Sequence, residues 1–349
     1  MMRSEIIRAR SILTAAIRCF FADKNYLEVE TPLLAPALIP ESAIEVFKTR
    51  FEHPCRAERE LCLIPSPELW MKRLLSAGFG NIFQICKAFR NAESIGRLHN
   101  PEFTILEYYT VGADYRDSLA LTEALFAQLI TVCRENLPRG AHIQAEKLDL
   151  LAPPFRRLTM AEAFREYAGL DLLALAPRET QEAPEATKRL TAAARAAGLP
   201  AADGDTWEEA FNRVFVDRVE PALPKDKPVV LLDYPRAVRC LARDIPGTPW
   251  NERWELYVDG METANCFTEE TSADKVTAYF RREAALKEKA LVPHAIDEEF
   301  AALYTTAGEA GGAPMASGVA LGLDRLIMAF CGEPSIGGVI LFPFSDMLR

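Results

Sequence analysis

The sequence lacks the signals that mark membrane proteins, zinc proteins and disulfide-rich proteins. No apolar run approaches the roughly eighteen residues that a membrane span needs, and residues 1–21 are amphipathic rather than signal-like. The 8 cysteines form no CxxC pair and the 4 histidines lack ligand spacing, so no zinc site is expected. We therefore expect a soluble, cytoplasmic protein with free thiols and no membrane partner.

Common signatures of nucleotide-binding and proteolytic enzymes are missing as well. The sequence contains no GxxxxGKS or GxxxxGKT phosphate loop, no HExxH pair and no internal repeat. Its net charge of −10 argues against a protein whose main task is to neutralise phosphate backbones, although a local basic patch stays compatible with it. The 349 residues, 49% of them hydrophobic, can bury a sizeable core, and one large domain with an inserted lobe fits best.

Apolar spacing predicts a helix at the start of the chain and a strand after it. In residues 6–21 the apolar side chains recur with helical spacing, which predicts an amphipathic helix. Alternation in residues 26–31 predicts a half-buried strand that Pro32 halts. The composition of residues 171–204 shifts to Ala, Glu, Arg and Pro, which predicts a peripheral helical insertion within about residues 150–225.

A second helix is predicted to begin at a Ser-Pro-Glu sequence. Ser66 suits the N-cap, and Pro67 suits the first helical position. Glu68 then lies near a helix N-terminus, where the helix dipole stabilises a carboxylate. On these residues alone, this structural role is favoured over a ligand-binding role.

The most informative segment is a pair of predicted strands joined by a long polar loop. Residues 82–89 and 103–109 predict largely buried strands, and Arg90 directly follows the first of them. The loop between them, residues 91–102 with His99, is much longer than an ordinary hairpin turn. Such loops are usually functional or disordered, and we favour function because this one carries Arg97, His99 and an Asn100-Pro101 turn. Arg90 before it could bind a phosphate through two N–H groups. A flexible surface hairpin is the alternative.

A predicted hairpin brings two glutamates together. The Asp-Gly pair at 259–260 between two alternating runs is a strong hairpin signal. A two-residue turn would pair Tyr257 with Glu262 and Glu255 with Ala264, which makes the two glutamates diagonal neighbours on one sheet face. Such side chains lie about 7–8 Å apart, close enough to share a magnesium ion. Two exposed strand glutamates are the alternative.

The segment 317–330 predicts a strand of small residues that passes through Gly322 into a helix. Arg325 would lie in the first helical turn, where a cation opposes the helix dipole, so it is a candidate to bind an anion. On its own this signal is weak, because glycine is common at strand–helix junctions for packing reasons.

These segments, in this order, resemble the catalytic core of the class II aminoacyl-tRNA synthetases, in particular the lysine-type subclass. Pro32 resembles motif 1, Phe89-Arg90 with residues 99–103 (HNPEF) resembles motif 2, and residues 322–325 (GLDR) resemble motif 3. The resemblance spans nearly the whole chain. It implies an α+β fold, an antiparallel sheet flanked by helices, and a homodimer formed through motif 1.

Two departures from the lysyl-tRNA synthetases narrow the resemblance further. The motif 1 helix begins within a few residues of Met1, so the anticodon-binding domain is expected to be absent, and no tRNA partner is expected. Ala320 stands where those enzymes typically have a second glycine. Both features are similar to the elongation factor P–(R)-β-lysine ligases, which are stand-alone paralogues.

That resemblance implies an ATP-dependent ligase that uses magnesium. The enzyme would activate (R)-β-lysine, or lysine, as an adenylate and transfer it to a lysine side chain of elongation factor P. Two alternatives stay open. One is an enzyme that charges lysine onto tRNA or a small molecule, and the other is an inert synthetase-like protein that only binds a translation factor.

The resemblance also implies roles for individual residues. Arg90 would hold the α-phosphate and the substrate carboxylate, Arg325 would hold the γ-phosphate, and both would be catalytic. Glu255 and Glu262 would hold magnesium. The ATP-binding set would be Arg90, Asn91, Glu93, Asn100, Glu262, Thr263, Gly322 and Arg325. The lysine-like substrate would contact Ser66, Pro67, Glu68, Tyr109, Asn265, Phe267, Glu269 and Ala320.

Strict strand alternation conflicts with one part of this assignment. It would direct three substrate residues to the sheet face opposite Glu262, namely Asn265, Phe267 and Glu269. A β-bulge near residues 264–266 would resolve the conflict, and bulges are common beside active sites.

Two further positions depart from the family pattern. Ala92 replaces the usual acidic residue after Arg90-Asn91, and Glu93 is the candidate substitute. Cys266 occupies a position that is normally glycine. Its side chain either crowds the site or packs against the core as a small hydrophobe.

Overall fold

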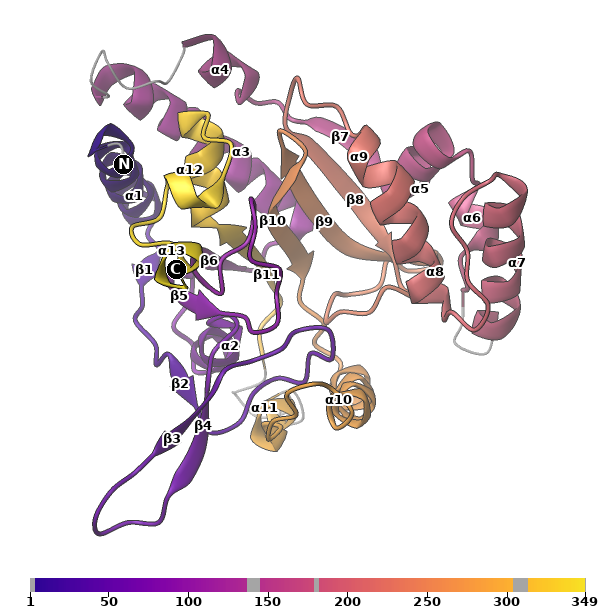
Figure 1. Ribbon diagram of the computed structural model, residues 1–349, viewed down its shortest axis with the longest axis horizontal. Coiled ribbons are helices and arrows are strands. Elements are labelled where there is room, and N and C mark those ends of the chain that lie inside the picture. Colours follow the sequence, from indigo (N-terminus) through magenta and orange to yellow (C-terminus); the bar gives the residue numbers. More distant parts are fainter. Residues whose placement is uncertain (1–3, 137–144, 179–181, 304–312, 349) are drawn as a thin grey trace.

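The computed structural model describes residues 4–136, 145–178, 182–303 and 313–348 (Figure 1). Its centre is an eight-stranded sheet in the order β1-β5-β6-β11-β10-β9-β8-β7. The inner strand pairs are antiparallel, whereas the two edge pairs, β1 with β5 and β7 with β8, are parallel. The predicted antiparallel sheet flanked by helices is therefore confirmed. Its strands are β1 (Leu27–Glu28), β5 (Ile82–Phe89), β6 (Glu102–Val111), β7 (Arg156–Thr159), β8 (Val229–Pro235), β9 (Trp250–Val258), β10 (Met261–Thr268) and β11 (Ala316–Gly322).

A second, three-stranded sheet extends from this body in the order β2-β4-β3. Figure 1 shows β3 and β4 projecting as a hairpin at the lower left. The strands are β2 (Leu34–Ala35), β3 (Lys48–Phe51) and β4 (Arg59–Leu63). All four residues of β3 are exposed, so this hairpin contributes little to the core.

Three helices pack on one face of the large sheet and enclose the main core. They are α1 (Ser4–Asp23), α3 (Tyr115–Asn136) and α12 (Leu323–Cys331). The rings of Phe21 on α1 and Phe83 on β5 stack with centroids 4.8 Å apart, and Trp254 on β9 is fully buried. The helix predicted for residues 6–21 is confirmed. The other described helices outside the lobe below are α2 (Glu68–Ser76), α4 (Ala145–Leu150), α10 (Ala273–Lys287), α11 (Glu298–Ala302) and α13 (Phe344–Met347), with a 3-10 turn at Ile336–Gly338.

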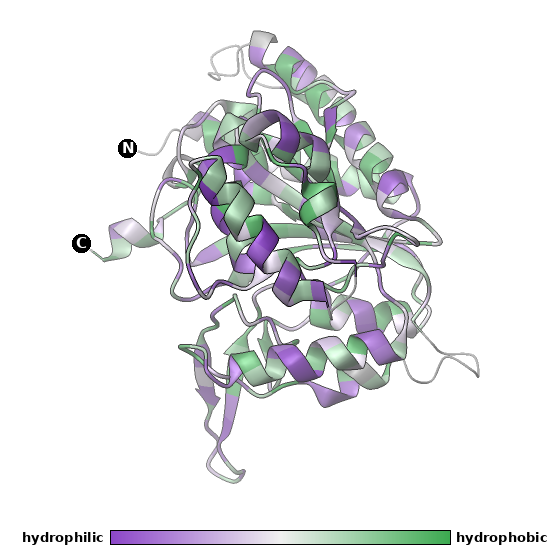
Figure 2. Ribbon diagram, turned by 90° about the vertical axis from the view of Figure 1, so that its right-hand side faces the viewer, coloured by the Kyte–Doolittle hydropathy of each residue, from purple (hydrophilic) through white to green (hydrophobic). Residues whose placement is uncertain are grey.

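A helical lobe lies between β7 and β8 along the chain. Figure 2 views the molecule from the side of this lobe and shows polar and apolar residues alternating along its helices. Their apolar sides form a separate core in which the rings of Phe164 and Phe211 stack at 4.8 Å. The described helices of the lobe are α5 (Met160–Ala163), α6 (Leu172–Leu175), α7 (Ala183–Ala196), α8 (Trp207–Val214) and α9 (Glu220–Ala222), with π-helical turns at Phe164–Ala168 and Phe215–Val219.

The strand predicted for residues 26–31 is shorter than expected, and its predicted alternation was wrong. Only Leu27 and Glu28 pair with β5, and both are exposed at the edge of the sheet. The backbone N–H of Val29 still donates to the carbonyl of Phe83 at 2.9 Å. Pro32 has no N–H to continue the ladder, so pairing ends before it.

No helix within the described ranges is both long enough and apolar enough to span a bilayer.

A buried carboxylate ties three elements together. Asp324, at the start of α12, is 2% exposed and accepts a hydrogen bond from Arg10 Nη1 of α1 at 2.5 Å. Its other oxygen accepts the backbone N–H of Thr104 on β6 at 2.7 Å. Arg10 also donates to Thr104 Oγ1 at 2.9 Å. Both carboxylate oxygens are therefore satisfied, which makes burial of the charge tolerable.

We expect Asp324→Ala to lower the free energy of unfolding by about 3 kcal/mol, because it leaves a buried N–H and a partly buried guanidinium without their partner. Urea denaturation followed by circular dichroism measures the change. Asp149→Ala is the matched control, since its ion pair with Arg134 is exposed and should contribute less than about 1 kcal/mol. Equal losses in both variants would contradict the structural role given to Asp324.

Candidate active site

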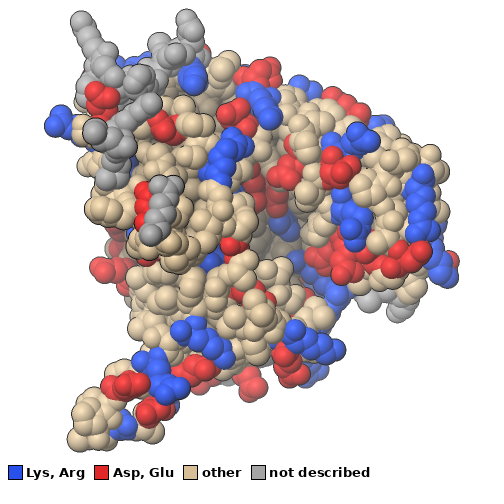
Figure 3. Space-filling view, viewed as in Figure 1, with Lys and Arg blue, Asp and Glu red and all other residues tan. Residues whose placement is uncertain are grey.

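A cavity of about 530 Å³ lies on the face of the large sheet that points away from the main core. Figure 3 shows this side of the molecule hollowed near its centre, with acidic and basic side chains at the rim. Of the predicted site residues, Pro67, Asn91 and Glu255 do not line the cavity. Those that do line it are Ser66, Glu68, Arg90, Glu93, Asn100, Tyr109, Glu262, Thr263, Asn265, Phe267, Glu269, Ala320, Gly322 and Arg325.

An irregularity in β10 directs these side chains to one face. Glu255 pairs with Asn265 rather than with the predicted Ala264, because the register shifts between Glu262 and Ala264. The expected bulge is therefore present, but it lies at Thr263, one residue before the predicted segment. Side chains on both sides of the bulge consequently reach the same cavity: Glu262, Asn265, Phe267 and Glu269.

Arg90 and Arg325 provide positive charge at one end of the cavity. Arg325 Nη1 donates to the carbonyl of Glu262 at 2.6 Å, and the Arg90 guanidinium lies 5.2 Å from the ring centroid of Phe103. Arg90 Nη1 is 3.7 Å from Glu93 Oε1, whereas Arg90 Nε is buried without a hydrogen-bond partner. An unsatisfied buried donor is costly, so this side chain is suited to bind an anion.

Glu262 is the carboxylate that faces these arginines. Burial and the charge of Glu255 raise its pKa to about 7, while Arg325 and Arg90 oppose the shift. Its side chain is nevertheless 45% exposed toward the cavity, and Arg325 Nη1 lies 4.0 Å from its Oε2. A second carboxylate that raises the proton affinity of Glu262 also favours a divalent cation beside it.

Glu255 is held by the protein rather than open to the cavity. Its Oε2 accepts hydrogen bonds from Tyr234 at 2.6 Å and from Tyr257 at 2.7 Å, and Arg253 donates to its Oε1 at 2.6 Å. A carboxylate has about four acceptor lone pairs, so Glu255 can still accept one further bond, at Oε1. The described residues contain no group of three or more His, Cys, Asp or Glu side chains that could hold a metal ion. A cation here would therefore rely on these two carboxylates together with oxygens of a bound substrate.

The two predicted nucleotide-binding asparagines hold the ends of the loop between β5 and β6. Asn100 donates to the carbonyl of Glu102 at 2.5 Å and accepts the backbone N–H of Phe344 at 2.8 Å. Asn91 donates to the carbonyl of Val46 at 3.3 Å. These contacts position Arg90 and the loop that follows it.

Elsewhere the cavity is acidic, and a buried lysine that does not line it lies beside two of its carboxylates. Lys72 Nζ lies 2.5 Å from Glu68 Oε1 and 2.6 Å from Glu269 Oε2, and the lysine is 2% exposed. Burial raises the pKa of Glu269 to about 7, although Lys72 opposes the shift. Lys72 was not among the predicted site residues. Its position four residues after Glu68 on one helix face is the signal that could have found it.

Two more carboxylates in the cavity were missed. Glu107 lies two residues before Tyr109 on β6, so strand alternation could have predicted it. Burial, followed by the charge of Glu68, raises the pKa of Glu107 well above its ordinary value. Glu41 lines the cavity from the loop between β2 and β3. No local pattern marks that loop position.

The start of α2 differs from the prediction. Pro67, not Ser66, is the N-cap, and no side chain caps the helix. The carbonyl of Pro67 accepts the backbone N–H groups of Trp70 and Met71 at 3.0 Å. The predicted N-cap Ser66 was therefore wrong. Ser66 lines the cavity instead, while Glu68 begins the helix with its side chain beside Lys72.

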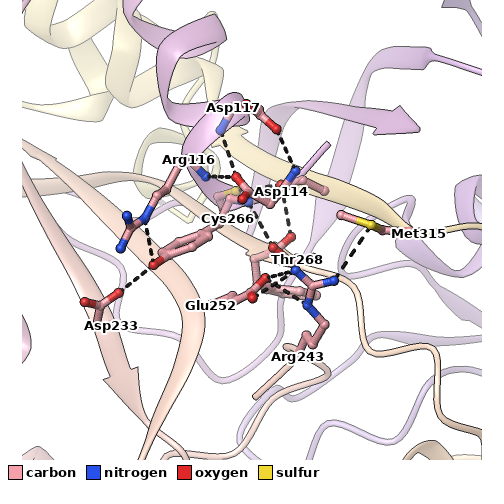
Figure 4. Close-up of polar contacts among 12 residues, drawn as sticks. Asp114, Arg116, Asp117, Asp233, Arg243, Glu252, Cys266, Thr268 and Met315 are labelled. Carbon is pink, nitrogen blue, oxygen red and sulfur yellow. Dashed lines mark hydrogen bonds and ion pairs between the residues drawn. The ribbon is translucent and has the colours of Figure 1, made fainter. Parts of the chain in front are cut away.

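Cys266 points away from the cavity. Its side chain is fully buried in the main core, where its Sγ lies 3.3 Å from Ser317 Oγ on β11. Figure 4 shows Cys266 within a polar network that includes Thr268, whose Oγ1 accepts the backbone N–H of Tyr115 at 2.9 Å. Of the two expectations for this residue, packing as a small core side chain is the one that the structure bears out.

Gly318 on β11 has no side chain, and its absence leaves room for the side chains of Tyr109 and Glu269 in the cavity. A Cβ atom at this position would lie 2.5 Å from the Tyr109 ring and 2.7 Å from Glu269 Oε1. Ala320, the next residue on the same face, lines the cavity with a methyl group and pairs with Glu107 on β6 and Asn265 on β10.

Comparisons with known proteins agree with this architecture. A family model described as tRNA synthetases class II (D, K and N) matches residues 2–346. The chain is similar to proteins named elongation factor P–(R)-β-lysine ligase from Vibrio cholerae, with 37% identity over 97% of this chain and 95% of the relative, and from Vibrio vulnificus, with 36% identity over 97% and 96%. It is also similar to a lysine–tRNA ligase of Pelotomaculum thermopropionicum, with 36% identity over 97% of this chain. The chain spans 63% of the length of that relative.

The raised pKa of Glu262 predicts a pH-dependent stability. In the folded chain the Glu262 carboxyl keeps its proton up to about pH 7, whereas in the unfolded chain it ionises near its ordinary pKa of 4.5. The proton therefore stabilises the folded state fully below about pH 4.5, and this stabilisation is lost as the pH rises through about 7. Glu262→Gln cannot ionise. The free energy of unfolding of Glu262→Gln, relative to that of the unchanged protein, should therefore increase between about pH 5 and about pH 8. The increase should be on the order of 1 kcal/mol, because the Glu262 side chain is partly solvated.

Urea denaturation at both pH values measures this gain. Glu58→Gln, at an exposed glutamate between β3 and β4, is the control and should show no pH-dependent difference. A Glu262→Gln difference that stays constant between the two pH values would be inconsistent with a raised pKa.

Proposed function

The chain belongs to the class II tRNA synthetases, and we propose that it is an ATP-dependent ligase that activates (R)-β-lysine as an adenylate and transfers it to a lysine side chain of elongation factor P. The observation that carries this proposal is the separation of charge within one cavity. Arg90 and Arg325 line it beside Glu93 and Glu262, whereas Glu68 and Glu269 line it around the buried Lys72. This arrangement suits a substrate whose reacting carboxylate must approach a triphosphate while its ammonium groups are held apart from it.

The relatives support the choice of substrate and acceptor. Two proteins that the chain matches over 95–96% of their length are named elongation factor P–(R)-β-lysine ligase. Ala320, which narrows the cavity by one methyl group, supports a substrate whose amine is displaced relative to that of lysine. A lysine–tRNA ligase activity is the second candidate, because relatives with that name are equally similar in sequence.

Catalysis would rest on positioning and charge neutralisation. The substrate carboxylate attacks the α-phosphorus of ATP, the bond to the β-phosphate oxygen breaks, and pyrophosphate leaves. Arg90 would orient the two reactants through its guanidinium, and Arg325 would bind the terminal phosphate. Magnesium, held by Glu262 with Glu255, would supply a further positive charge to the phosphates when bound.

The second step needs no protein nucleophile. The neutral amine of the acceptor lysine attacks the carbonyl carbon of the adenylate, an amide bond forms as the amine nitrogen gives up one proton to solvent or to the leaving phosphate, and AMP leaves with the mixed-anhydride oxygen. The protein's contribution is to hold the adenylate in place and to keep water away from it.

We also propose that the chain forms a single catalytic domain, with the helical lobe as a peripheral insertion. Two copies of the chain would form the homodimer that the motifs imply. The exposed edge strand β1 supports the dimer, because Leu27 is 49% exposed there. No tRNA acceptor is part of this proposal.

The activation step predicts ATP–pyrophosphate exchange that depends on (R)-β-lysine. Arg325→Ala should lower kcat/KM for exchange about 100-fold or more, because a cation that neutralises developing phosphate charge is lost. Arg97→Ala is the matched control, since Arg97 belongs to the loop between β5 and β6 but does not line the cavity. No exchange with any diamino acid would reject the proposed activation.

The transfer step is tested with three acceptor conditions: elongation factor P, tRNA and no acceptor. We expect radiolabelled (R)-β-lysine to become attached to elongation factor P, detected after gel electrophoresis. Preferential charging of tRNA would favour the second candidate function instead.

Gly318→Ala should raise KM for the diamino acid more than 10-fold, on the order of what overpacking by one methyl group costs, while KM for ATP changes little. The reason is the collision of the new methyl group with Tyr109 and Glu269 at the acidic end. Gly96→Ala, at a glycine whose added Cβ meets no atom within 4 Å, is the control. A larger effect on ATP than on the amino acid would refute the assignment of this end to the diamino acid.

A further inference from the structure

The carboxylate of Glu255 is held by two tyrosines and one arginine. Tyr234 donates to its Oε2 at 2.6 Å, and Tyr257 donates to the same oxygen at 2.7 Å. Arg253 donates to the other oxygen, Oε1, at 2.6 Å. Glu255 and both tyrosines are buried, so these partners are fixed by the packing around them. The proposed reaction steps give neither tyrosine a task.

The two oxygens of this carboxylate are not equally available to a ligand. A carboxylate oxygen accepts about two hydrogen bonds. The tyrosine hydroxyls fill both acceptor positions of Oε2, whereas Oε1 accepts only from Arg253 and keeps one position open. A cation beside Glu262 can therefore engage Glu255 through one oxygen, Oε1, and not through both.

This restriction matters because magnesium and calcium use carboxylates differently. Mg²⁺ requires a nearly octahedral set of oxygens at about 2.0–2.1 Å and combines one or two carboxylates with phosphate oxygens and water. Ca²⁺ takes about 6–8 oxygens at about 2.3–2.6 Å and readily accepts both oxygens of one carboxylate. A carboxylate that offers one oxygen therefore suits Mg²⁺ better than Ca²⁺.

The helical lobe fixes the two tyrosine rings. Tyr234 on β8 and Tyr257 on β9 belong to the apolar core of the lobe, which lies beside these strands in Figure 1. The ring of Phe215, on a π-helical turn of the lobe, packs edge-on against Tyr257 with centroids 6.5 Å apart. The Arg253 guanidinium lies 4.5 Å from the ring centroid of Tyr234. Neither hydroxyl can turn away from Glu255 without disturbing this packing.

We infer that Tyr234 and Tyr257 are positioning residues that restrict Glu255 to one free oxygen and thereby select Mg²⁺ over Ca²⁺. The lobe takes part in this selection because its core holds both rings, although none of its described residues lines the cavity. The inference rests on the proposed function, in which Glu255 and Glu262 hold the metal that accompanies ATP. It adds the choice of metal to that function.

The test measures binding of α,β-methylene-ATP, which cannot be cleaved between its α- and β-phosphates, by isothermal titration calorimetry. The analogue is offered as its Mg²⁺ complex, as its Ca²⁺ complex and free of metal in EDTA. Tyr234→Phe and Tyr257→Phe each keep the ring and remove one hydroxyl, which frees one acceptor position on Oε2.

We expect Kd of the Mg²⁺ complex to rise about 10-fold in each variant, as is usual when a metal ligand loses an outer hydrogen bond. Kd of the Ca²⁺ complex should rise by less than about threefold, because the freed position lets Ca²⁺ use both oxygens. Kd of the metal-free analogue should stay within about twofold, because the tyrosines act only through Glu255.

Tyr108→Phe is the matched control. Its hydroxyl is also buried and lies 2.6 Å from Thr122 Oγ1, but it belongs to the main core and should leave all three Kd values unchanged. Phe215→Leu tests the lobe and should shift the ratio of the two metal-complex Kd values in the same direction, by about threefold. An unchanged ratio in this variant would overturn the role given to the lobe.

Equal losses for both metal complexes in the tyrosine variants, or no loss at all, would overturn the inference. A loss that extends to the metal-free analogue would make the tyrosines structural residues and would also overturn it. In both cases ATP–pyrophosphate exchange by the unchanged protein would leave the proposed function standing. Absence of that exchange would reject the proposed function itself, and this inference with it.

Discussion

One extra residue in strand β10 decides what the cavity contains. With strict alternation, Asn265 and Glu269 would face the opposite side of the sheet from Glu262. The main core would then receive a carboxylate, and Cys266 would enter the cavity. The bulge at Thr263 reverses both outcomes, so Cys266 packs beside Ser317 and the polar side chains reach one site. The register of a single hairpin thus links the packing of the core to the chemistry of the open face.

The second constraint is electrostatic. Arg90 and Arg325 line the cavity beside Glu93 and Glu262, whereas Glu68 and Glu269 line it around the buried Lys72. Buried like charges would destabilise the fold, and the chain limits this cost with internal partners. Lys72 lies between Glu68 and Glu269, while Glu255 accepts three hydrogen bonds. These internal partners limit what the charged side chains of the cavity cost the stability of the domain.

Much of the fold was predictable because the main signals are local. The helix in residues 6–21, the strands on both sides of the long loop and the Asp-Gly turn follow from apolar spacing and turn chemistry. The pairing of Tyr257 with Glu262 was correct for the same reason, because the turn sets it. Beyond the bulge the prediction failed, and Glu255 faces Asn265 instead. The N-cap of α2 was also wrong, since Ser66 faces the cavity and leaves capping to the backbone.

Three short motifs, with their order and spacing, allowed the sequence by itself to determine the family and to predict many of the residues that line the cavity. They are conspicuous because phosphate binding and tight turns restrict the residue types at each position. Tertiary structure alone decided the acidic end. Lys72, Glu107 and Glu41 come from a helix, a strand and an irregular loop, and their effect depends on distances between segments far apart in the chain. A local sequence pattern indicates on which face of a helix or strand a residue lies. Which buried charges lie next to one another is decided only when those helices, strands and loops pack together.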